Sequence, residues 1–279
     1  MKRPTTSTLV ASLLLAGLIV QGCGPASQPS PDTRTTQTVS GVTVTVFAAA
    51  SLTEAFAELA QHFEADHPGV TVVCNLASSQ QLSQQLGQGA PADVFASANT
   101  KEMNNAIAAG RVADGSQRVF CHNKLVVIYP TDNPAGLDKL QDLAKPGLKL
   151  VIAAEEVPVG KYSLEFLDKA SQDAAFGATF KHDVVKNVVS YEENVKAVLT
   201  KVVLGEGDAG IVYLTDISLD NADKVGRLEI PDALNAVATY PIAAVSDAEQ
   251  PQLARAFIDL VLSTQGQAIL AKYGFLAAD

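Results

Sequence analysis

The sequence predicts an α/β fold in which largely parallel sheets are covered by helices. Strand-like and helix-like patterns alternate from Val42 to the C-terminus, which is typical of parallel strands joined by helices. Residues 42–279 form a stretch that is long for one compact domain and suits two. Several strand-to-helix junctions carry small, hydroxyl-bearing or tight-turn residues. Because ligands of open α/β sheets bind at the carboxyl ends of strands, these junctions are candidate ligand contacts.

The N-terminal segment is predicted to lie outside this fold. Two basic residues precede the apolar run Leu9–Val20, which is short for a membrane span and typical of a secretory signal over residues 1–22. The residues before Cys23 resemble a lipobox, the site at which bacterial lipoproteins are cleaved and lipidated on cysteine, although Gln21 is unusual at its middle position. An ordinary signal peptide with a chance cysteine is the alternative. Residues 23–41 are rich in Pro, Ser and Thr and are expected to form a flexible tether.

The first strand and helix of the fold are predicted at residues 42–63. Val42, Val44 and Val46 alternate with threonines, as in a strand, and apolar residues then recur at helical spacing. Ser51 and Glu54 stand where the helix begins, and their spacing matches a capping box.

The later elements follow the same alternation. Helices are expected around Leu82 and Leu86, from Asn99 or Thr100 to near Gly110, over residues 161–170 and 195–205, and at the C-terminal end around Phe257. Gly205 is expected to end its helix. The strands, some with an attached loop or cap, are expected over residues 70–79, 93–99, 124–130, 148–160, 185–194, 208–216 and 240–247.

The junction at Ser51 supports a second interpretation, an anion site. A helix N-terminus has backbone N–H groups without acceptors and carries positive partial charge. The alanines at positions 48–50 leave room for a ligand to approach the backbone. Such a site binds an anion without any basic side chain, whereas on the simpler interpretation Ser51 only caps the helix.

Three other junctions have comparable features. Ser78 and Ser79 begin the second helix, and Pro158, Val159 and Gly160 begin a later one. Asn194 and Val195 lie in the first turn of another helix. We expect these helix starts to contribute further donors.

Composition excludes some classes of partner. The chain has 20 basic and 30 acidic residues and a formal charge of −10. Removal of residues 1–22 deletes Lys2 and Arg3 and no acid, which leaves −12. Nucleic acid and anionic membrane surfaces are therefore unsuitable partners.

The chain has few signs of catalytic or metal chemistry. Its four histidines are scattered, and no histidine or lysine pattern near Ser51 supplies a base for a nucleophilic serine. We therefore expect a protein that is not an enzyme, with no cofactor and no metal ligands. Cys74 and Cys121 both lie in or near strand patterns, where a disulfide and two buried thiols are both compatible with the sequence.

At this point the motifs resemble those of a known family. "VFAAASLT", "ASS", "GAPADVFASA", "NKLVV", "VPVG", "GIVY" and "KYGF" are similar to segments of the periplasmic molybdate-binding proteins of molybdate ABC importers (ModA family). The resemblance runs from about Val42 to Phe275. It implies the type II periplasmic-binding-protein fold, with two α/β domains joined by a two-strand hinge and the ligand in the cleft between them. The expected domains are residues 42–121 with 241–279, and residues 122–240.

The resemblance also implies the ligand contacts. In the first domain Ser51 and Ser79 are expected to donate hydroxyl and backbone N–H bonds to molybdate. In the second domain the donors are expected to be the backbone N–H groups of Val159 and Val195 and the phenol of Tyr213. Molybdate is a dianion without a proton at neutral pH, so a site of donors alone suits it. Lys161, next to Gly160, could add positive charge to the site, but a solvated position in the first helical turn is the preferred interpretation.

The implied function is capture of molybdate, and of tungstate nearly as well, outside the cytoplasmic membrane and delivery to the membrane permease. The receptor is expected to be a monomer, periplasmic or at the cell surface, and anchored to the membrane by a lipid on Cys23. Two alternatives remain: a receptor for another tetrahedral oxyanion such as sulfate or phosphate, and a serine hydrolase with Ser51 as nucleophile. Protonated phosphate calls for an acceptor, and the matched positions contain none.

Overall fold

The computed structural model describes residues 41–217 and 221–278. The signal peptide, the lipidation at Cys23 and all but the last residue of the tether are predicted for segments outside these residues. Within the described part, no helix combines the length and the apolar character needed to cross a membrane.

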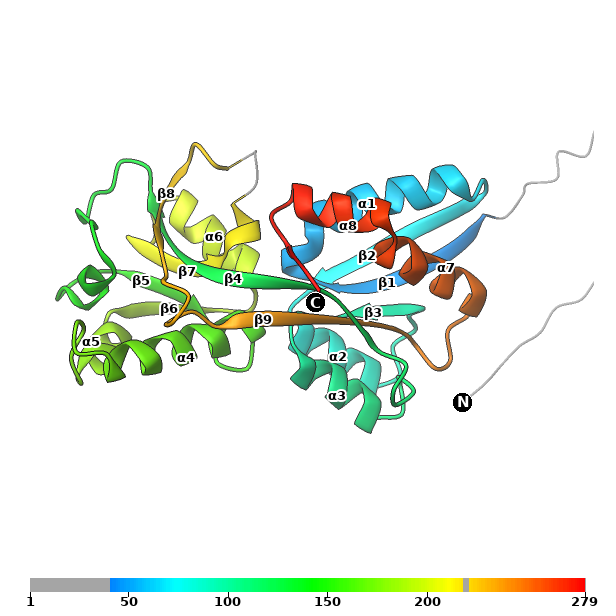
Figure 1. Cartoon of the computed structure of the whole chain (residues 1–279), viewed down its shortest axis with the longest axis horizontal. Coiled ribbons are helices and arrows are strands. Elements are labelled where there is room, and N and C mark those ends of the chain that lie inside the picture. Colours follow the sequence, from blue (N-terminus) through cyan, green and yellow to red (C-terminus); the bar gives the residue numbers. More distant parts are fainter. Residues whose placement is uncertain (1–40, 218–220, 279) are drawn as a thin grey trace, which may run out of the picture. The chain divides into compact units, whose positions relative to one another are not determined.

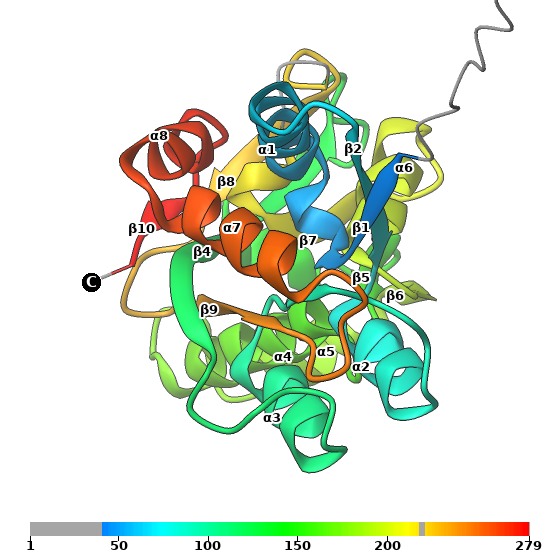
Figure 2. The ribbon, with the colours of Figure 1, turned by 90° about the vertical axis from the view of Figure 1, so that its right-hand side faces the viewer.

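One half of the fold, the first lobe, is built around β1, the long strand that the valine alternation predicts. β1 pairs in parallel with β2 and β3, and β3 pairs antiparallel with β9. Helices α1, α7 and α8 lie on one side of these strands and α2 and α3 on the other (Figures 1 and 2). The elements of this lobe are β1 (Val42–Ala49), η1 (Ala50–Leu52), α1 (Thr53–Asp66), β2 (Val70–Ala77), α2 (Ser79–Gly87), β3 (Val94–Ala96), α3 (Thr100–Ala108), α7 (Pro251–Leu262), α8 (Thr264–Lys272) and β10 (Leu276–Ala277).

The other half, the second lobe, repeats the arrangement with shorter strands. β5 pairs in parallel with β6 and with β7. Helix α6 lies on one side of these strands, and α4 and α5 lie on the other (Figure 1). The elements of this lobe are η2 (Leu140–Ala144), β5 (Leu150–Ala153), α4 (Pro158–Gln172), α5 (Phe180–Lys186), β6 (Val188–Glu192), α6 (Val195–Val203), β7 (Ala209–Tyr213), η3 (Leu214–Asp216) and β8 (Val225–Glu229).

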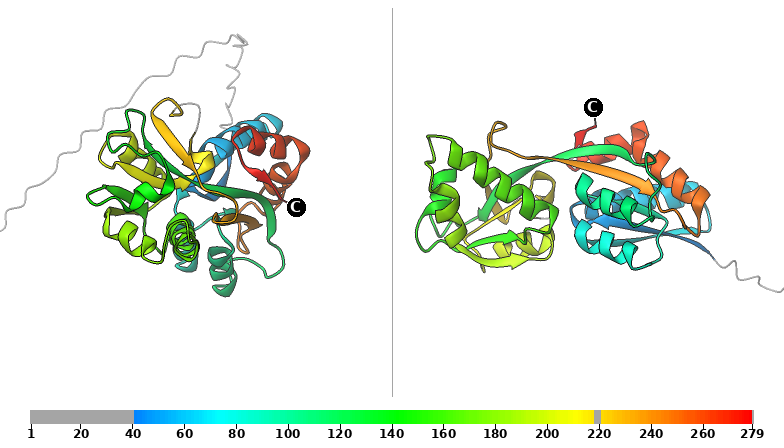
Figure 3. Two further views of the ribbon diagram at one scale, coloured as in Figure 1. Left: turned by 60° about the vertical axis from the view of Figure 1, so that its left-hand side comes forward. Right: turned by 90° about the horizontal axis from the view of Figure 1, so that it is seen from below.

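Two long strands connect the lobes, β4 (Arg118–Pro130) and β9 (Val237–Ala244) (Figure 3). β4 pairs with β9 along Arg118–Lys124 and with β7 along Leu125–Ile128. The change of partner lies three residues beyond the predicted domain boundary at 121/122, and the predicted boundary at 240/241 falls inside β9. The division into two domains at those residues stays a prediction.

The core of the first lobe shows why alternating valines specify a central strand. In β1, Val42 and Thr43 are exposed, Val44 is buried and Thr45 is half-buried, whereas the last four residues, Val46–Ala49, are all buried. A parallel strand covered on both sides has this pattern. On α1, Phe56 and Phe63 pack edge-on against Phe257 of α7, with ring centroids 5.9 and 5.4 Å apart.

The alternation of strands and helices is confirmed, but some elements are missing from the prediction. Helix α5 and strands β8 and β10 were not expected, and the C-terminal helical stretch is two helices that meet at Ser263. Ser263 caps the second of them, because its Oγ accepts the N–H of Gly266 at 3.1 Å. Short elements such as these have too few residues to display a period.

Candidate functional site

The first junction differs from the predicted helix cap. A 3₁₀ turn, η1, separates β1 from α1, and Ser51 lies in its middle, 3% exposed. The N-cap of α1 is Leu52, without a side-chain cap. The Ser51 hydroxyl instead makes a 2.8 Å hydrogen bond with Tyr240 Oη. The prediction of a capping box between Ser51 and Glu54 is therefore wrong, because the intervening 3₁₀ turn separates Ser51 from the first residue of α1.

The second junction agrees with its prediction. Ser78 is the N-cap of α2, and it forms a capping box with Gln81. Ser79 is the first residue of the helix and is buried. Its Oγ accepts the backbone N–H of Ala98 at 2.9 Å.

The two junctions of the second lobe present backbone N–H groups. Helix α4 begins with Pro158 and places Val159 second, while α6 begins with Val195 after the N-cap Asn194. The Asn194 side chain accepts the N–H of Ala197 at 3.0 Å. Because the N–H groups of a first helical turn have no acceptor within the helix, those of Val159 and Val195 are available to a ligand.

Tyr213 ends β7 and supplies the remaining predicted donor. It is 2% exposed, and its hydroxyl has no hydrogen-bond partner among the described residues. Its backbone N–H donates to Asp216 Oδ2 at 3.0 Å. Burial, together with the neighbouring Tyr240, raises the pKa of Tyr213 well above its usual value, so the phenol keeps its proton at neutral pH.

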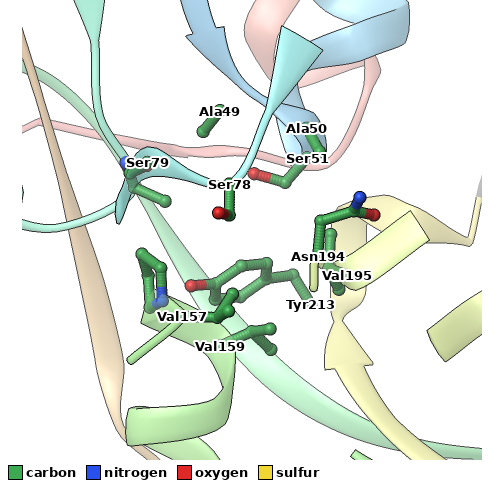
Figure 4. A pocket seen from close by; sticks show the side chains of 12 residues that line it. Ala49, Ala50, Ser51, Ser78, Ser79, Val157, Val159, Asn194, Val195 and Tyr213 are labelled. Carbon is green, nitrogen blue, oxygen red and sulfur yellow. Dashed lines mark hydrogen bonds between the residues drawn. The ribbon is translucent and has the colours of Figure 1, made fainter. Parts of the chain in front are cut away.

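These junctions meet at one small pocket (Figure 4). Ser51, Ser78 and Ser79 approach it from the first lobe, and Tyr213, Val157 and Val159 face them from the second (Figure 4). About 20 Å³ is available there to the centres of water-sized molecules, so the pocket suits a compact solute of a few atoms. The lining consists of Ala49, Ala50, Ser51, Ser78, Ser79, Ala98, Val157, Pro158, Val159, Asn194, Val195 and Tyr213.

All five predicted ligand residues therefore lie at the same pocket, although they come from separate parts of the chain. The lining contains no charged side chain within the described parts of the chain. Its polar groups are hydroxyls, one capping amide and the N-termini of α4 and α6, which carry positive partial charge. Such a set is suited to an anion that only accepts hydrogen bonds.

Several residues around the pocket were not foreseen. Tyr240 and Asn123 lie behind Ser51, with Asn123 Nδ2 3.3 Å from Tyr240 Oη. Lys196, next to Val195, contacts the carboxylates of Glu54 at 2.8 Å and Asp216 at 3.4 Å. The position of Lys196 directly after a predicted ligand residue was a sequence signal of a role near the pocket. Its ion-pair partners are distant in sequence and could not be identified from it.

Burial and ion pairing determine the pKa values of the two charged groups next to the pocket, Asp216 and Lys196. Burial raises the pKa of Asp216 to about 6, against the opposing effects of Lys196 and the N–H of Tyr213. Burial lowers the pKa of Lys196, but Asp216 and Glu54 outweigh it, so the pKa of Lys196 is raised. Lys161, by contrast, lies on the surface and pairs with Glu165 on its own helix at 3.7 Å, as expected for a solvated residue.

The two internal cysteines are separate thiols. Cys121 is buried and Cys74 is half-buried, and both are free. Burial raises the pKa of Cys74 to about 11, and it also raises that of Cys121. The structure thus selects the thiols over the disulfide, which the sequence had left undecided.

Comparison with known proteins agrees with the family resemblance of the sequence motifs. Residues 44–276 match the family model of a bacterial extracellular solute-binding protein. The molybdate-binding protein ModA of Mycobacterium tuberculosis H37Rv is 39% identical over 268 residues, which cover 96% of this chain and 95% of that protein.

Solved structures agree on the fold. The substrate-binding domain of a putative molybdenum ABC transporter from Clostridium difficile is 28% identical with a TM-score of 0.63, over 86% of this chain and all of that one. The sulfate-binding protein SubI from M. tuberculosis H37Rv has a TM-score of 0.75 at 21% identity, over 85% of this chain and 88% of that one. The fold alone is therefore compatible with more than one oxyanion.

Proposed function

Because this chain belongs to the bacterial extracellular solute-binding proteins, we propose that it captures molybdate outside the cytoplasmic membrane and delivers it to the permease of an ABC importer. The observation that carries the proposal is the meeting of Ser51, Ser79, Val159, Val195 and Tyr213 at one uncharged pocket. The 39% identity to a molybdate-binding protein over nearly the whole chain supports molybdate as the solute.

The donor set explains how a neutral pocket holds a dianion. Ser51 and Ser79 supply hydroxyl protons, Val159 and Val195 supply backbone N–H groups, and Tyr213 supplies a buried phenol. Hydrogen bonds to charged groups contribute about 1.5–3 kcal/mol each. A handful of them reaches sub-micromolar affinity after the ordering costs are subtracted.

Capture also involves both lobes. Ser51 and Ser79 belong to the first lobe, while the other three donors belong to the second. An anion that contacts both sets favours the conformation in which the lobes approach each other. β4 and β9 run through both lobes and are the two strands about which such a motion occurs.

Several finer properties belong to the same proposal. Tungstate has the charge and tetrahedral shape of molybdate and is expected to bind nearly as well. The receptor acts as a monomer without a cofactor, held at the membrane by a lipid on Cys23. The mass of the exported protein tests the anchor: a lipidated mass that is absent in Cys23→Ser supports it, and an unmodified wild-type protein contradicts it.

The alternatives are weaker on the observed geometry. A hydrolase needs a base beside Ser51, and the described lining residues include no histidine, lysine or acid. A serine-reactive phosphonate that labels Ser51 would favour the enzyme. A sulfate receptor has the same charge requirement, so only measurement separates it from a molybdate receptor.

Calorimetric titration with molybdate, tungstate, sulfate and phosphate tests the proposal. We expect tight binding of the first two and weak binding of the others. Molybdate should also raise the Tm, because a ligand that binds only the folded state stabilises it. No Tm shift at millimolar molybdate, or an equal shift with sulfate, would overturn the assignment.

A further inference from the structure

A chain of buried hydrogen bonds connects the two long strands to the pocket. Asn123 on β4 lies beside Tyr240 on β9, and Tyr240 contacts Ser51. All three side chains are nearly inaccessible to solvent. Among them only Ser51 lines the pocket.

The orientation of the Asn123 amide is determined by its neighbours. Its Oδ1 accepts the backbone N–H of Lys124 at 2.9 Å. Its Nδ2 donates to Thr215 Oγ1 at 2.8 Å and to Tyr240 Oη at 3.3 Å. The flipped amide would direct its NH₂ group at the N–H of Lys124, which is another donor.

This orientation sets the direction of the next hydrogen bond. Tyr240 Oη accepts from Asn123, and its other side-chain hydrogen bond among the described residues joins it to Ser51 Oγ at 2.8 Å. If Ser51 donated to Tyr240, the phenolic proton would have no hydrogen-bonded acceptor among the described residues, because the hydroxyl of the neighbouring Tyr213 makes no hydrogen bond. An unpaired buried donor is unfavourable. Tyr240 therefore donates to Ser51. Burial raises the pKa of Tyr240 well above its usual value, so the phenol retains the proton that it donates.

The consequence for Ser51 is that its own proton points to the ligand. With a lone pair of Oγ occupied by Tyr240, the Ser51 hydroxyl donates into the pocket. Ser79 is in the same state, because the N–H of Ala98 donates to its Oγ. Both serines thus have their acceptor side engaged by the protein.

We propose that Tyr240, oriented by Asn123, is a positioning residue that makes Ser51 a committed donor and so selects fully deprotonated oxyanions over protonated ones. This inference rests on the proposed anion-binding function and deepens it. Sulfate and molybdate carry no proton and accept from every donor of the pocket. Hydrogen phosphate brings a proton of its own, for which a committed Ser51 provides no acceptor.

Tyr240→Phe removes the relay and allows the Ser51 hydroxyl to rotate. We expect the affinities for molybdate and sulfate to fall together, by about three- to tenfold. The affinity for hydrogen phosphate should fall less, because Ser51 can then accept its proton. Tyr273→Phe is the matched control, since it also removes one phenol, which donates to Glu58 at 2.7 Å away from the pocket.

Asn123→Asp reverses the relay rather than removing it. The new carboxylate accepts from Tyr240, so Ser51 donates to Tyr240 and presents a lone pair to the pocket. All anions should bind more weakly beside the added charge, but the ratio of phosphate to sulfate affinity should rise above that of Tyr240→Phe. Urea unfolding of each variant establishes that the fold is retained.

The measurement is displacement of bound molybdate by phosphate and by sulfate at neutral pH. A rise in the phosphate-to-sulfate ratio in both variants, and none in Tyr273→Phe, supports the relay. An unchanged ratio in both variants, or no displacement by phosphate from any of the proteins, overturns the relay while the molybdate function stands. A wild-type protein that binds no oxyanion overturns both.

Discussion

Lys196 of α6 lies 2.8 Å from the carboxylate of Glu54 on α1, and this ion pair joins the two lobes. Each partner adjoins a predicted ligand contact: Lys196 follows Val195, and Glu54 lies one turn beyond Ser51. A contact of this kind forms only when the lobes are close together. The pair therefore favours the conformation in which the pocket-lining residues of the two lobes face each other.

Glu54→Gln tests this ion pair, because it removes the partner on the first lobe and leaves Asp216 to neutralise Lys196. We expect molybdate affinity to fall about two- to fivefold, as for a partly exposed pair. Small-angle scattering of the ligand-free variant should give a larger radius of gyration than that of the wild type. Glu165→Gln is the control, since it removes a carboxylate that pairs with Lys161 within α4. Equal affinities for Glu54→Gln and this control would show that the pair does not assist closure.

The buried carboxylate of Asp216 gives a second prediction, on pH. Its pKa of about 6 is above the ordinary value of 3.8, so the folded state holds this proton more tightly than the unfolded chain. Its contribution to the free energy of unfolding is therefore greatest below about pH 4 and is lost as the pH rises to about 6. Two pKa units correspond to roughly 3 kcal/mol.

Asp216→Asn removes that titration and keeps an acceptor for the N–H of Tyr213. The free energy of unfolding of the variant, minus that of the wild type, should increase between pH 4 and pH 6 and then level off. Urea unfolding of both proteins across this range provides the measurement. Taking the difference cancels the opposite trend of carboxylates with lowered pKa values, such as Asp142. A flat difference would mean that Asp216 titrates as in the unfolded chain.

Gly160 gives a third prediction, on the backbone of α4. A Cβ there would overlap the carbonyl oxygen of Ala154 and lie 2.5 Å from that of Ala153. Gly160→Ala should therefore displace the helix start that carries Val159, with a loss of about 1–3 kcal/mol in stability and weaker molybdate binding. At Gly87 the nearest atom to an added Cβ is 3.8 Å away, so Gly87→Ala should leave both quantities close to wild type. Calorimetry measures the molybdate affinity of the two variants, and urea unfolding measures their stability. Equal affinities for Gly160→Ala and Gly87→Ala would show that the first turn of α4 is not a ligand contact.

Ser51 gives the fourth prediction, which tests whether its side chain contacts the anion. Ser51→Ala loses a donor to the anion and should reduce molybdate affinity by about tenfold or more. Ser51→Asp keeps an acceptor for Tyr240 but places a carboxylate in the pocket, so it should bind almost no molybdate. Titration of the three proteins at matched ionic strength compares them. Wild-type affinity in Ser51→Asp would mean that Ser51 has no contact with the ligand.

The sequence was informative where a residue's role is local. The small residues before Ser51, the serine cap at Ser78 and the asparagine cap at Asn194 are visible in a few neighbouring letters, and the structure has them at the same pocket. The prediction that Ser51 caps α1 was wrong for a local reason as well, because the periodicities of strand and helix do not reveal a 3₁₀ turn between them.

The sequence does not reveal contacts between residues that are far apart along the chain. Tyr240 is 189 positions from Ser51, and Lys196 is 142 from Glu54. No periodicity connects such pairs, because their contact depends on how β9 and α6 pack in the folded chain. The pKa of Asp216 was concealed for the same reason, since its burial is a property of the whole fold.

The uncharged lining of the pocket has an electrical consequence. If the pocket binds a dianion as proposed, its hydroxyl and N–H donors hold the ligand without neutralising its charge, and none of them gains or loses a proton at neutral pH. The exported chain, with a formal charge of −12 after removal of residues 1–22, would therefore become more negative on loading by the full charge of its solute. Loaded and empty molecules differ in electrophoretic mobility and in retention on an anion exchanger. Because these donors do not titrate, we expect the heat of binding to be independent of the buffer's ionisation enthalpy at a pH well above the pKa of Asp216, which is about 6.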